Sequence, residues 1–282
     1  MIKKTLVEYF NESIVENWDL LALADYKGVG FTYGELGERI KKTHLFFEKS
    51  GIKKGDKVAL IGKNSAEWAI SFLAIVSYGA VVVPILPDFT SKDVHHIVTH
   101  SEAKLFFVSS NLYSNYDFEE MKTLEGILII KDNVLSDYRK KNIKTVHDSF
   151  ETDFEKLFPK GFKREDLKFE SISNEELAAI NYTSGTTGFS KGVMLNHKSL
   201  ASNIRFAENN MPLKSGDAIV SFLPLAHAYG MAFEFLFPFS IGCHITFLTK
   251  TPSPVIITQA FKEIKPRLIL SVPLVIEKIF KK

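Results

Sequence analysis

The sequence predicts an α/β protein built from two series of parallel βαβ units. The chain has 282 residues, 45% of them hydrophobic, which is enough to bury one large core or two smaller ones. Short apolar runs alternate with helical patterns in residues 57–109, and the alternation starts again at residue 178. Such alternation is typical of parallel sheets that carry helices on both faces.

The first series contains short apolar runs, often β-branched, with helical patterns between them. We expect strands at residues 57–62, 80–85 and 104–109, and helices at residues 65–78 and 91–101. Ser65 is suited to cap the first of these helices because its hydroxyl can accept a hydrogen bond from an unpaired amide of the first turn.

A more polar region separates the two series. Within it we expect one strand at residues 126–130, and we interpret residues 139–170 as loops and short helices. The second series predicts strands at 178–183, 218–223, 244–248 and 267–272, and helices at 196–209 and 253–265. Residues 272–282 resemble the first turns of a helix with no stop signal after it, which predicts that the chain is cut inside a larger protein.

Composition excludes several function classes. The formal net charge is +2 and the charges are interspersed, so we expect no nucleic-acid partner. Cys243 is the single cysteine, which rules out an intramolecular disulfide and favours a reducing, cytoplasmic location. Residues 69–86 and 222–248 are long and apolar, but Gly, Pro and Glu punctuate them, and we expect buried core elements there instead of membrane spans.

The segment TSGTTGFSKG, residues 183–192, concentrates groups that suit phosphate. Its glycines permit backbone conformations that turn successive N–H groups toward one anion, and its hydroxyls and Lys191 add donors and a positive charge. It is not a Walker A loop, because Ser190 precedes Lys191 and Gly192 follows it. The alternative on composition alone is a solvent-exposed Gly/Ser/Thr linker.

The order of residues in this segment resembles the T-S-G-T-T-G-x-x-K-G motif of the adenylate-forming (AMP-binding) superfamily. Other segments are similar to family elements: FTYGELGERI (31–40), KKGDKVAL (53–60), YGAVVVPI (78–85), FLPLAHAYG (222–230) and SVPLVIEKI (271–279). The last resembles a V-P-x-x-x-E-K-I segment of long-chain fatty acyl-CoA synthetases, although Leu274 stands where arginine is usual. The resemblance covers nearly the whole chain and is weakest in residues 111–169.

The resemblance implies a two-step reaction. A carboxylate attacks the α-phosphorus of ATP, pyrophosphate leaves, and the thiol of coenzyme A then displaces AMP from the acyl-adenylate. Mg²⁺ would bridge phosphate oxygens, and no residue is identifiable as its protein ligand, so we predict no protein metal site. The residues implied to hold the β- and γ-phosphates are Thr183, Ser184, Gly185, Thr186, Thr187, Gly188 and Lys191.

His227 is the implied catalytic residue, near the acyl pocket and the α-phosphate. Its sequence neighbours are apolar, which suits an acyl chain, and the alternative is a core histidine bonded to backbone. His96 and His100 lie one helical turn apart, but no further ligand completes a metal site, and a solvated helix face is favoured. We expect His197 to pack or to cap the helix that it begins.

The implied fold is an incomplete N-terminal acyl-adenylating domain, truncated before the small barrel and the C-terminal domain. Its lobes would be residues 55–195 and residues 1–54 with 196–282. The function expected of the intact protein is ligation of a long-chain fatty acid to coenzyme A, with this chain inactive alone. The alternatives are another adenylate-forming ligase, for aryl or amino acids, or a non-catalytic nucleotide-binding module. The sequence leaves open the oligomeric state, the acyl chain length and a peripheral contact with the inner membrane face.

Overall fold

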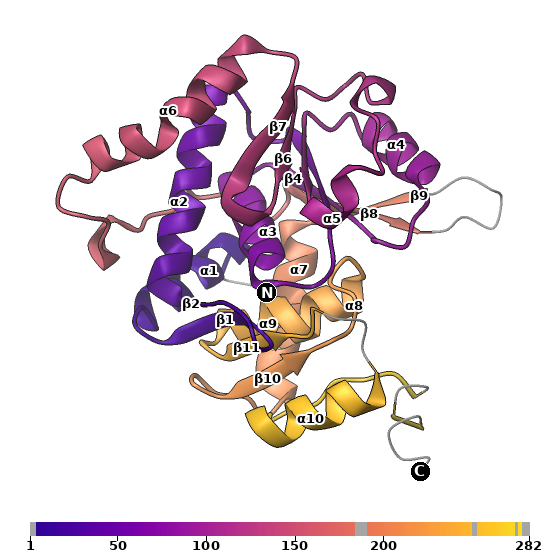
Figure 1. Cartoon of the computed structure of the whole chain (residues 1–282). Helices are drawn as coiled ribbons and strands as arrows, with labels where there is room; N and C mark the ends of the chain where they lie inside the picture. The colour runs from indigo at the N-terminus through magenta and orange to yellow at the C-terminus, as the bar shows by residue number, and fades with distance from the viewer. Residues whose placement is uncertain (1–3, 184–190, 250–252, 274–275, 278–282) are drawn as a thin grey trace.

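A computed structural model describes residues 4–183, 191–249, 253–273 and 276–277. It contains a seven-stranded sheet in the order β7-β6-β5-β3-β4-β8-β9 and a four-stranded sheet in the order β10-β11-β1-β2 (Figure 1). The strands of the large sheet are β3 (Lys57–Ile61), β4 (Val81–Ile85), β5 (Leu105–Val108), β6 (Gly126–Ile129), β7 (Val134–Tyr138), β8 (Leu177–Thr183) and β9 (Lys191–Asn196). Those of the small sheet are β1 (Leu21–Asp25), β2 (Gly30–Thr32), β10 (Ala218–Ser221) and β11 (His244–Phe247).

The centre of each sheet is parallel, and antiparallel strands form both edges of the large sheet and one edge of the small sheet. In the large sheet β6, β5, β3, β4 and β8 run parallel, while β7 and β9 are antiparallel to their neighbours. In the small sheet β10, β11 and β1 are parallel and β2 is antiparallel. The α/β prediction is therefore confirmed. The carboxyl ends of β3, β4 and β8 lie at one edge of the large sheet, which is where ligands bind in open α/β sheets.

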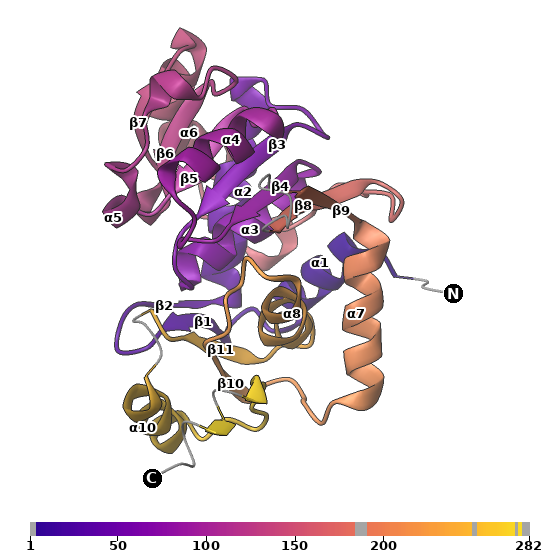
Figure 2. The same cartoon turned by 90° about the vertical axis from the view of Figure 1, so that its right-hand side faces the viewer.

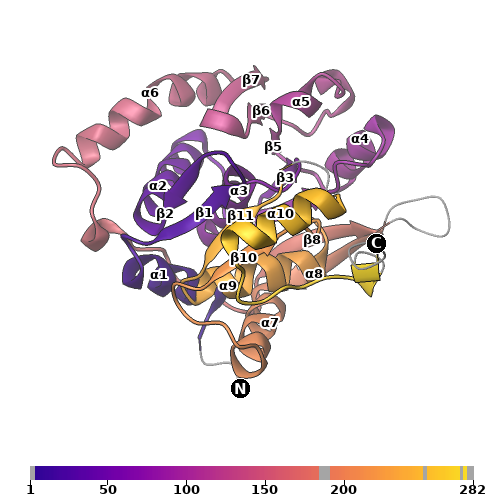
Figure 3. The same cartoon turned by 60° about the horizontal axis from the view of Figure 1, so that its bottom comes forward.

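The two sheets and their helices form five layers (Figure 2). Helix α4 (Ser91–His100) covers the outer face of the large sheet, and α10 (Pro254–Ile264) covers the outer face of the small one (Figure 3). Helices α2 (Tyr33–Ser50) and α3 (Ala66–Tyr78) lie between the sheets, and one apolar core joins both inner faces. Nearly every residue of α3 is buried, which explains why residues 69–86 are apolar without being a membrane span.

Local chemistry sets the ends of α3. The Ser65 hydroxyl accepts a hydrogen bond from the Trp68 amide at 3.1 Å, so the predicted N-cap is confirmed. Gly79 ends the helix with φ of 91°, a left-handed conformation that glycine adopts without strain. No helix in the described part of the chain is long and apolar enough to cross a bilayer.

Two expectations for the elements are wrong, and several elements were not predicted at all. Residues 139–170 contain α6 (Lys141–Leu157), a helix whose apolar positions at spacings of three and four pack on α2. The predicted strand 267–272 contributes only an isolated bridge from Leu268 to Ile219. The strands β1, β2, β7 and β9 and the helices α1 (Leu6–Glu16) and α2 were not anticipated. Most of the predicted final helix lies outside the described residues.

The remaining elements are short, apart from one predicted helix. That helix, α7 (His197–Asn210), agrees with the expectation for residues 196–209. The others are α5 (Ser110–Tyr113), α8 (Ala228–Gly230), α9 (Phe237–Ser240), the 3-10 turns η1 (Phe118–Glu120), η2 (Lys131–Asn133) and η3 (Arg164–Asp166), and a π-helical turn η4 (Met231–Leu236).

Candidate active site

The segment 183–192 connects the two strands of a hairpin. Strands β8 and β9 are antiparallel, and Thr183 at the end of β8 faces Lys191 at the start of β9. Both residues are exposed, so a hydroxyl and an ammonium stand at the paired ends of the two strands. The other predicted phosphate-binding residues, Ser184, Gly185, Thr186, Thr187 and Gly188, lie outside the described residues. The hairpin itself was not predicted, because β9 looked like part of the loop.

The hairpin is packed against α4 close to the end marked by Thr183 and Lys191. The Tyr182 hydroxyl lies 2.7 Å from His100 Nδ1, and a Cβ at Gly192 would come within 2.9 Å of Ile180 and 3.3 Å of the Tyr182 ring. A residue with a Cβ at position 192 would therefore force the Ile180 side chain to shift. His100 is tied to the hairpin, and within the described ranges no group of three His, Cys, Asp or Glu side chains is placed to hold a metal ion.

His227 stands at the N-cap position of α8 and is exposed. Its accessibility contradicts the alternative of a core histidine. The helix folds back tightly, because a Cβ at Gly230 would meet the Pro224 carbonyl oxygen at 2.6 Å. The apolar residues near His227 in the sequence differ in exposure. Leu225 and Met231 are buried, whereas Tyr229, two residues after His227, is 47% exposed. Most of the aromatic series in residues 222–247 is core, as expected.

His197 begins α7 and is fully buried. Neither of its ring nitrogens has a hydrogen-bond partner among the described residues. Burial lowers the pKa of its imidazole to about 4, so the ring is neutral near pH 7. Asn196 caps the helix, which leaves His197 a packing role.

The backbone before His227 is held by side chains from three different elements. We call residues 222–226 the histidine loop. Asn64, after β3, donates to Leu223 O at 2.7 Å and accepts from Leu225 N at 3.0 Å. Asn181, in β8, donates to Ala226 O at 2.8 Å. Both asparagines belong to the large sheet and its connections, whereas the histidine loop follows β10 of the small sheet.

Glu234 holds the other end of the histidine loop. Its Oε2 accepts from Phe222 N and Leu223 N, both at 2.8 Å, and from the Ser221 hydroxyl at 3.0 Å. The side chain is buried in η4, and its Oε1 has no hydrogen-bond partner in the described structure. Burial raises the pKa of this carboxyl to about 8, although the three donors act in the opposite direction.

Sequence reasoning missed all three of these side chains. The available signal was a polar residue inside an apolar run, as at Asn181 in AAINYT and Glu234 in MAFEFLF. A buried polar group of this kind is normally hydrogen-bonded, so its position in an apolar run predicts a specific partner. The partner itself lies about 160 residues away for Asn64 and about 45 for Asn181, and the sequence does not identify it.

A cavity of about 150 Å³ lies beside the histidine loop, between the two sheets. Its lining comes from the carboxyl ends of β3, β4, β10 and β11, and includes Asn64, Leu86, Pro87, Phe222, Ala226 and Leu248. Because β8 is parallel to β4, Thr183 ends at the same edge of the large sheet. The phosphate-suited hairpin, His227 and an apolar cavity therefore share one region.

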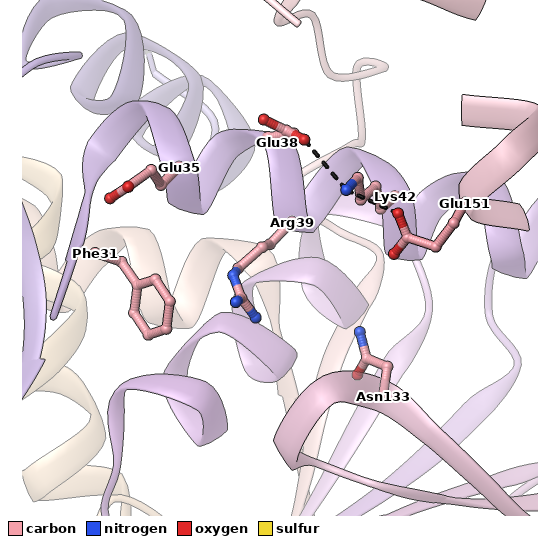
Figure 4. A pocket seen from close by; sticks show the side chains of 7 residues that line it. All are labelled: Phe31, Glu35, Glu38, Arg39, Lys42, Asn133 and Glu151. Carbon is pink, nitrogen blue, oxygen red and sulfur yellow. Dashed lines mark ion pairs between the residues drawn. The ribbon is translucent and has the colours of Figure 1, made fainter. Parts of the chain in front are cut away.

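A second cavity, of about 380 Å³, lies between α2 and α6 (Figure 4). Its acidic and basic groups neutralise one another: Lys42 pairs with Glu38 at 3.2 Å and with Glu151 at 2.8 Å. Arg39 packs over the Phe31 ring, 4.5 Å from its centroid. In Figure 1, α6 lies on the side of the molecule opposite β8 and β9, so this cavity is separate from the candidate site.

Comparison with known proteins identifies the family. The model for the family described as AMP-binding enzyme matches residues 10–282, and the chain belongs to that family. The long-chain-fatty-acid–CoA ligase heimdall of Drosophila melanogaster is 28% identical over 300 residues, a match that covers 98% of this chain and 42% of the relative. The chain thus spans less than half the length of this relative.

Solved structures share the fold. The inhibitor-bound N-terminal domain of FACL13 from Mycobacterium tuberculosis has a TM-score of 0.80 at 19% identity, covering 99% of this chain and 65% of that one. ATP-bound MatB from Rhodopseudomonas palustris has a TM-score of 0.76 at 23% identity, covering 98% and 51%. The fold is that of the N-terminal domain of adenylate-forming enzymes.

The buried carboxyl of Glu234 predicts a specific pH dependence of stability. Its pKa is about 8 in the folded state against an ordinary value of 4.5, so the folded state binds more protons between these values. The contribution of Glu234 to the free energy of unfolding is complete below pH 4.5 and falls as pH rises toward 8, by at most ~1.4 kcal/mol per pH unit.

Glu234→Gln is neutral at every pH and should lose this slope. Urea unfolding of the variant and of the unaltered protein at several values between pH 5 and 8 tests the difference. Glu16→Gln, at an exposed position, is the matched control and should leave the slope unchanged. Parallel pH profiles for Glu234→Gln and the unaltered protein would contradict the assignment.

Proposed function

We propose that this chain is the ATP-binding part of an acid–CoA ligase whose acid is a long-chain fatty acid. The carrying observation is that Thr183 and Lys191, which flank the motif residues 184–190, are paired at the ends of β8 and β9, at the same sheet edge as the cavity and the histidine loop. Membership of the AMP-binding family supports the use of ATP, and a relative named as a long-chain-fatty-acid–CoA ligase supports the acid.

In this proposal Thr183, Lys191 and residues 184–188 hold the β- and γ-phosphates while the carboxylate attacks the α-phosphorus. Thr183 donates a hydrogen bond, and the Lys191 ammonium stabilises the charge that builds on the leaving pyrophosphate. Ser184, Gly185, Thr186, Thr187 and Gly188 complete the cradle as a prediction. Mg²⁺ would neutralise phosphate charge when bound to the nucleotide.

His227 is proposed to act on the α-phosphate side of the site. It is exposed, and it lies one residue beyond the histidine loop that lines the 150 Å³ cavity. An imidazole there can donate a hydrogen bond to a phosphate or carboxylate oxygen and so orient the two reacting groups. Coenzyme A is the proposed acceptor of the acyl group.

Some expectations go no further than proposals. These are the division into lobes at residues 55–195 and residues 1–54 with 196–282, a cytoplasmic location and a peripheral contact with the inner membrane face. The competing functions are a ligase for aryl or amino acids and a non-catalytic nucleotide-binding module. One assay distinguishes these two competing functions from the main proposal.

The assay is carboxylate-dependent exchange between ATP and pyrophosphate with Mg²⁺, across acids of graded chain length. The full-length gene product and this chain are measured side by side. We expect exchange by the full-length protein, fastest with long-chain acids, and none by this chain alone. Exchange only with aryl or amino acids would replace the substrate class, and no exchange with any acid would favour the binding module.

Substitution of Lys191 tests the phosphate cradle directly. Lys191→Ala in the full-length protein should lower kcat for exchange by about 10²- to 10³-fold, because one preorganised donor to developing charge is removed. Lys198→Ala is the matched control. Lys198, on α7, is also exposed, and its ammonium pairs with the Glu175 carboxylate at 3.0 Å. If both lysine variants lose the same activity, Lys191 has no special role.

A further inference from the structure

We propose that Asn181 is a positioning residue that joins the phosphate-binding hairpin to His227 through one hydrogen bond. The inference rests on the proposed function and adds a residue that the family motif does not include. The bond runs from Asn181 Nδ2 to Ala226 O at 2.8 Å. It links β8 of the large sheet to the loop that follows β10 of the small sheet.

The position of Asn181 along β8 determines which residues the hydrogen bond brings into one unit. Alternate residues of a strand point to the same face, so Asn181 and Thr183 share a face of β8. Tyr182 between them points to the opposite face and packs in the core beneath α4. Thr183 is therefore two residues beyond the donor of this bond, and His227 is one residue beyond its acceptor.

Other hydrogen bonds restrain the rest of the histidine loop, so the position that Asn181 gives to Ala226 determines the position of His227. Asn64 fixes Leu223 and Leu225, and Glu234 fixes Phe222 and Leu223. His227 N donates back to Pro224 O at 3.0 Å. With the loop restrained at both ends, the position of Ala226 O sets where the backbone enters His227.

Stability alone does not favour an amide at position 181. The side chain is 7% exposed, and its Oδ1 has no partner within the described ranges. A buried unsatisfied oxygen is destabilising, and such groups in folded proteins call for an explanation. A link between two parts of a site is such an explanation, because only a side chain with a donor can hold the Ala226 carbonyl.

The test is a double-mutant cycle in the full-length protein, read by exchange between ATP and pyrophosphate. Asn181→Leu removes the donor and keeps a similar volume. We expect it to lower kcat by about 10- to 100-fold, as misplacement of a reacting group by about 1 Å can do, with the KM for ATP changed less. In the His227→Ala background the same substitution should lower kcat by less than about twofold, because coupled residues are not additive.

Asn17→Leu is the matched control. Asn17 is similarly buried and donates to a backbone carbonyl, Ser13 O, at 2.9 Å, but it lies at the end of α1. Its effect on kcat should be the same with and without His227. If Asn181→Leu does not fold, Asn181→Ser, whose hydroxyl is too short to reach Ala226 O, takes its place in the cycle.

A second readout separates this inference from the proposed function. The His227 ring resonance, in protein labelled at histidine, should shift or broaden in Asn181→Leu and stay unchanged in Asn17→Leu. An unchanged His227 resonance, or an equal loss of kcat in both backgrounds, overturns the positioning role. If the unaltered protein shows no exchange, the proposed function fails, and the resonance alone decides whether Asn181 positions His227.

Discussion

The candidate site depends on side-chain hydrogen bonds that cross from one sheet to the other. Asn64, in the turn after β3, bonds to Leu223 and Leu225 of the histidine loop. The amide of Ala66, the first residue of α3, donates to Asp25 Oδ1 of the small sheet at 2.8 Å. These contacts are directional, unlike the apolar packing behind them. They fix the loop that follows β10 against the end of β3, and the cavity between the sheets takes its walls from both.

Apolar packing brings the sheets together but does not by itself align their edges. Helix α3 is buried on all sides, with Trp68 and Phe72 among its fully buried side chains, and it contacts strands of both sheets. Hydrophobic burial is non-directional and depends on the apolar area removed from water, so it does not specify which backbone atoms of the two edges meet. Hydrogen bonds from Asn64 and Asn181 to specific backbone atoms supply the missing alignment.

The sequence was sufficient for the parts of the fold with strong local patterns. Short apolar runs predicted β3, β4 and β5, and Ser65 predicted the start of α3. Helix α6 was missed because its region was judged by polarity, although Ile143, Val146, Phe150 and Phe154 follow helical spacing. The isolated bridge at Leu268 shows the opposite error, in which an apolar run reads as a strand without forming one.

The residues of the candidate site also fall into those that the sequence could identify and those that it could not. Motif order identified Thr183, Lys191 and His227 as candidates, because the family resemblance is local in sequence. The residues that hold the histidine loop could not be predicted, because Asn64, Asn181 and Glu234 are defined by partners that only the folded chain brings near. Local signals therefore found the groups expected to meet substrate, and tertiary contacts were needed to find the groups that place them.

The most direct test of these contacts between the sheets is amide hydrogen exchange at Leu225. Its N–H donates to Asn64 Oδ1 at 3.0 Å, so it should exchange about as slowly as the His244 amide at the start of β11, which donates to Asp217 O at 2.8 Å. In Asn64→Ala the Leu225 amide should exchange much faster while the His244 amide stays protected. Rapid exchange at Leu225 in the unaltered protein, or protection that survives Asn64→Ala, would contradict the account.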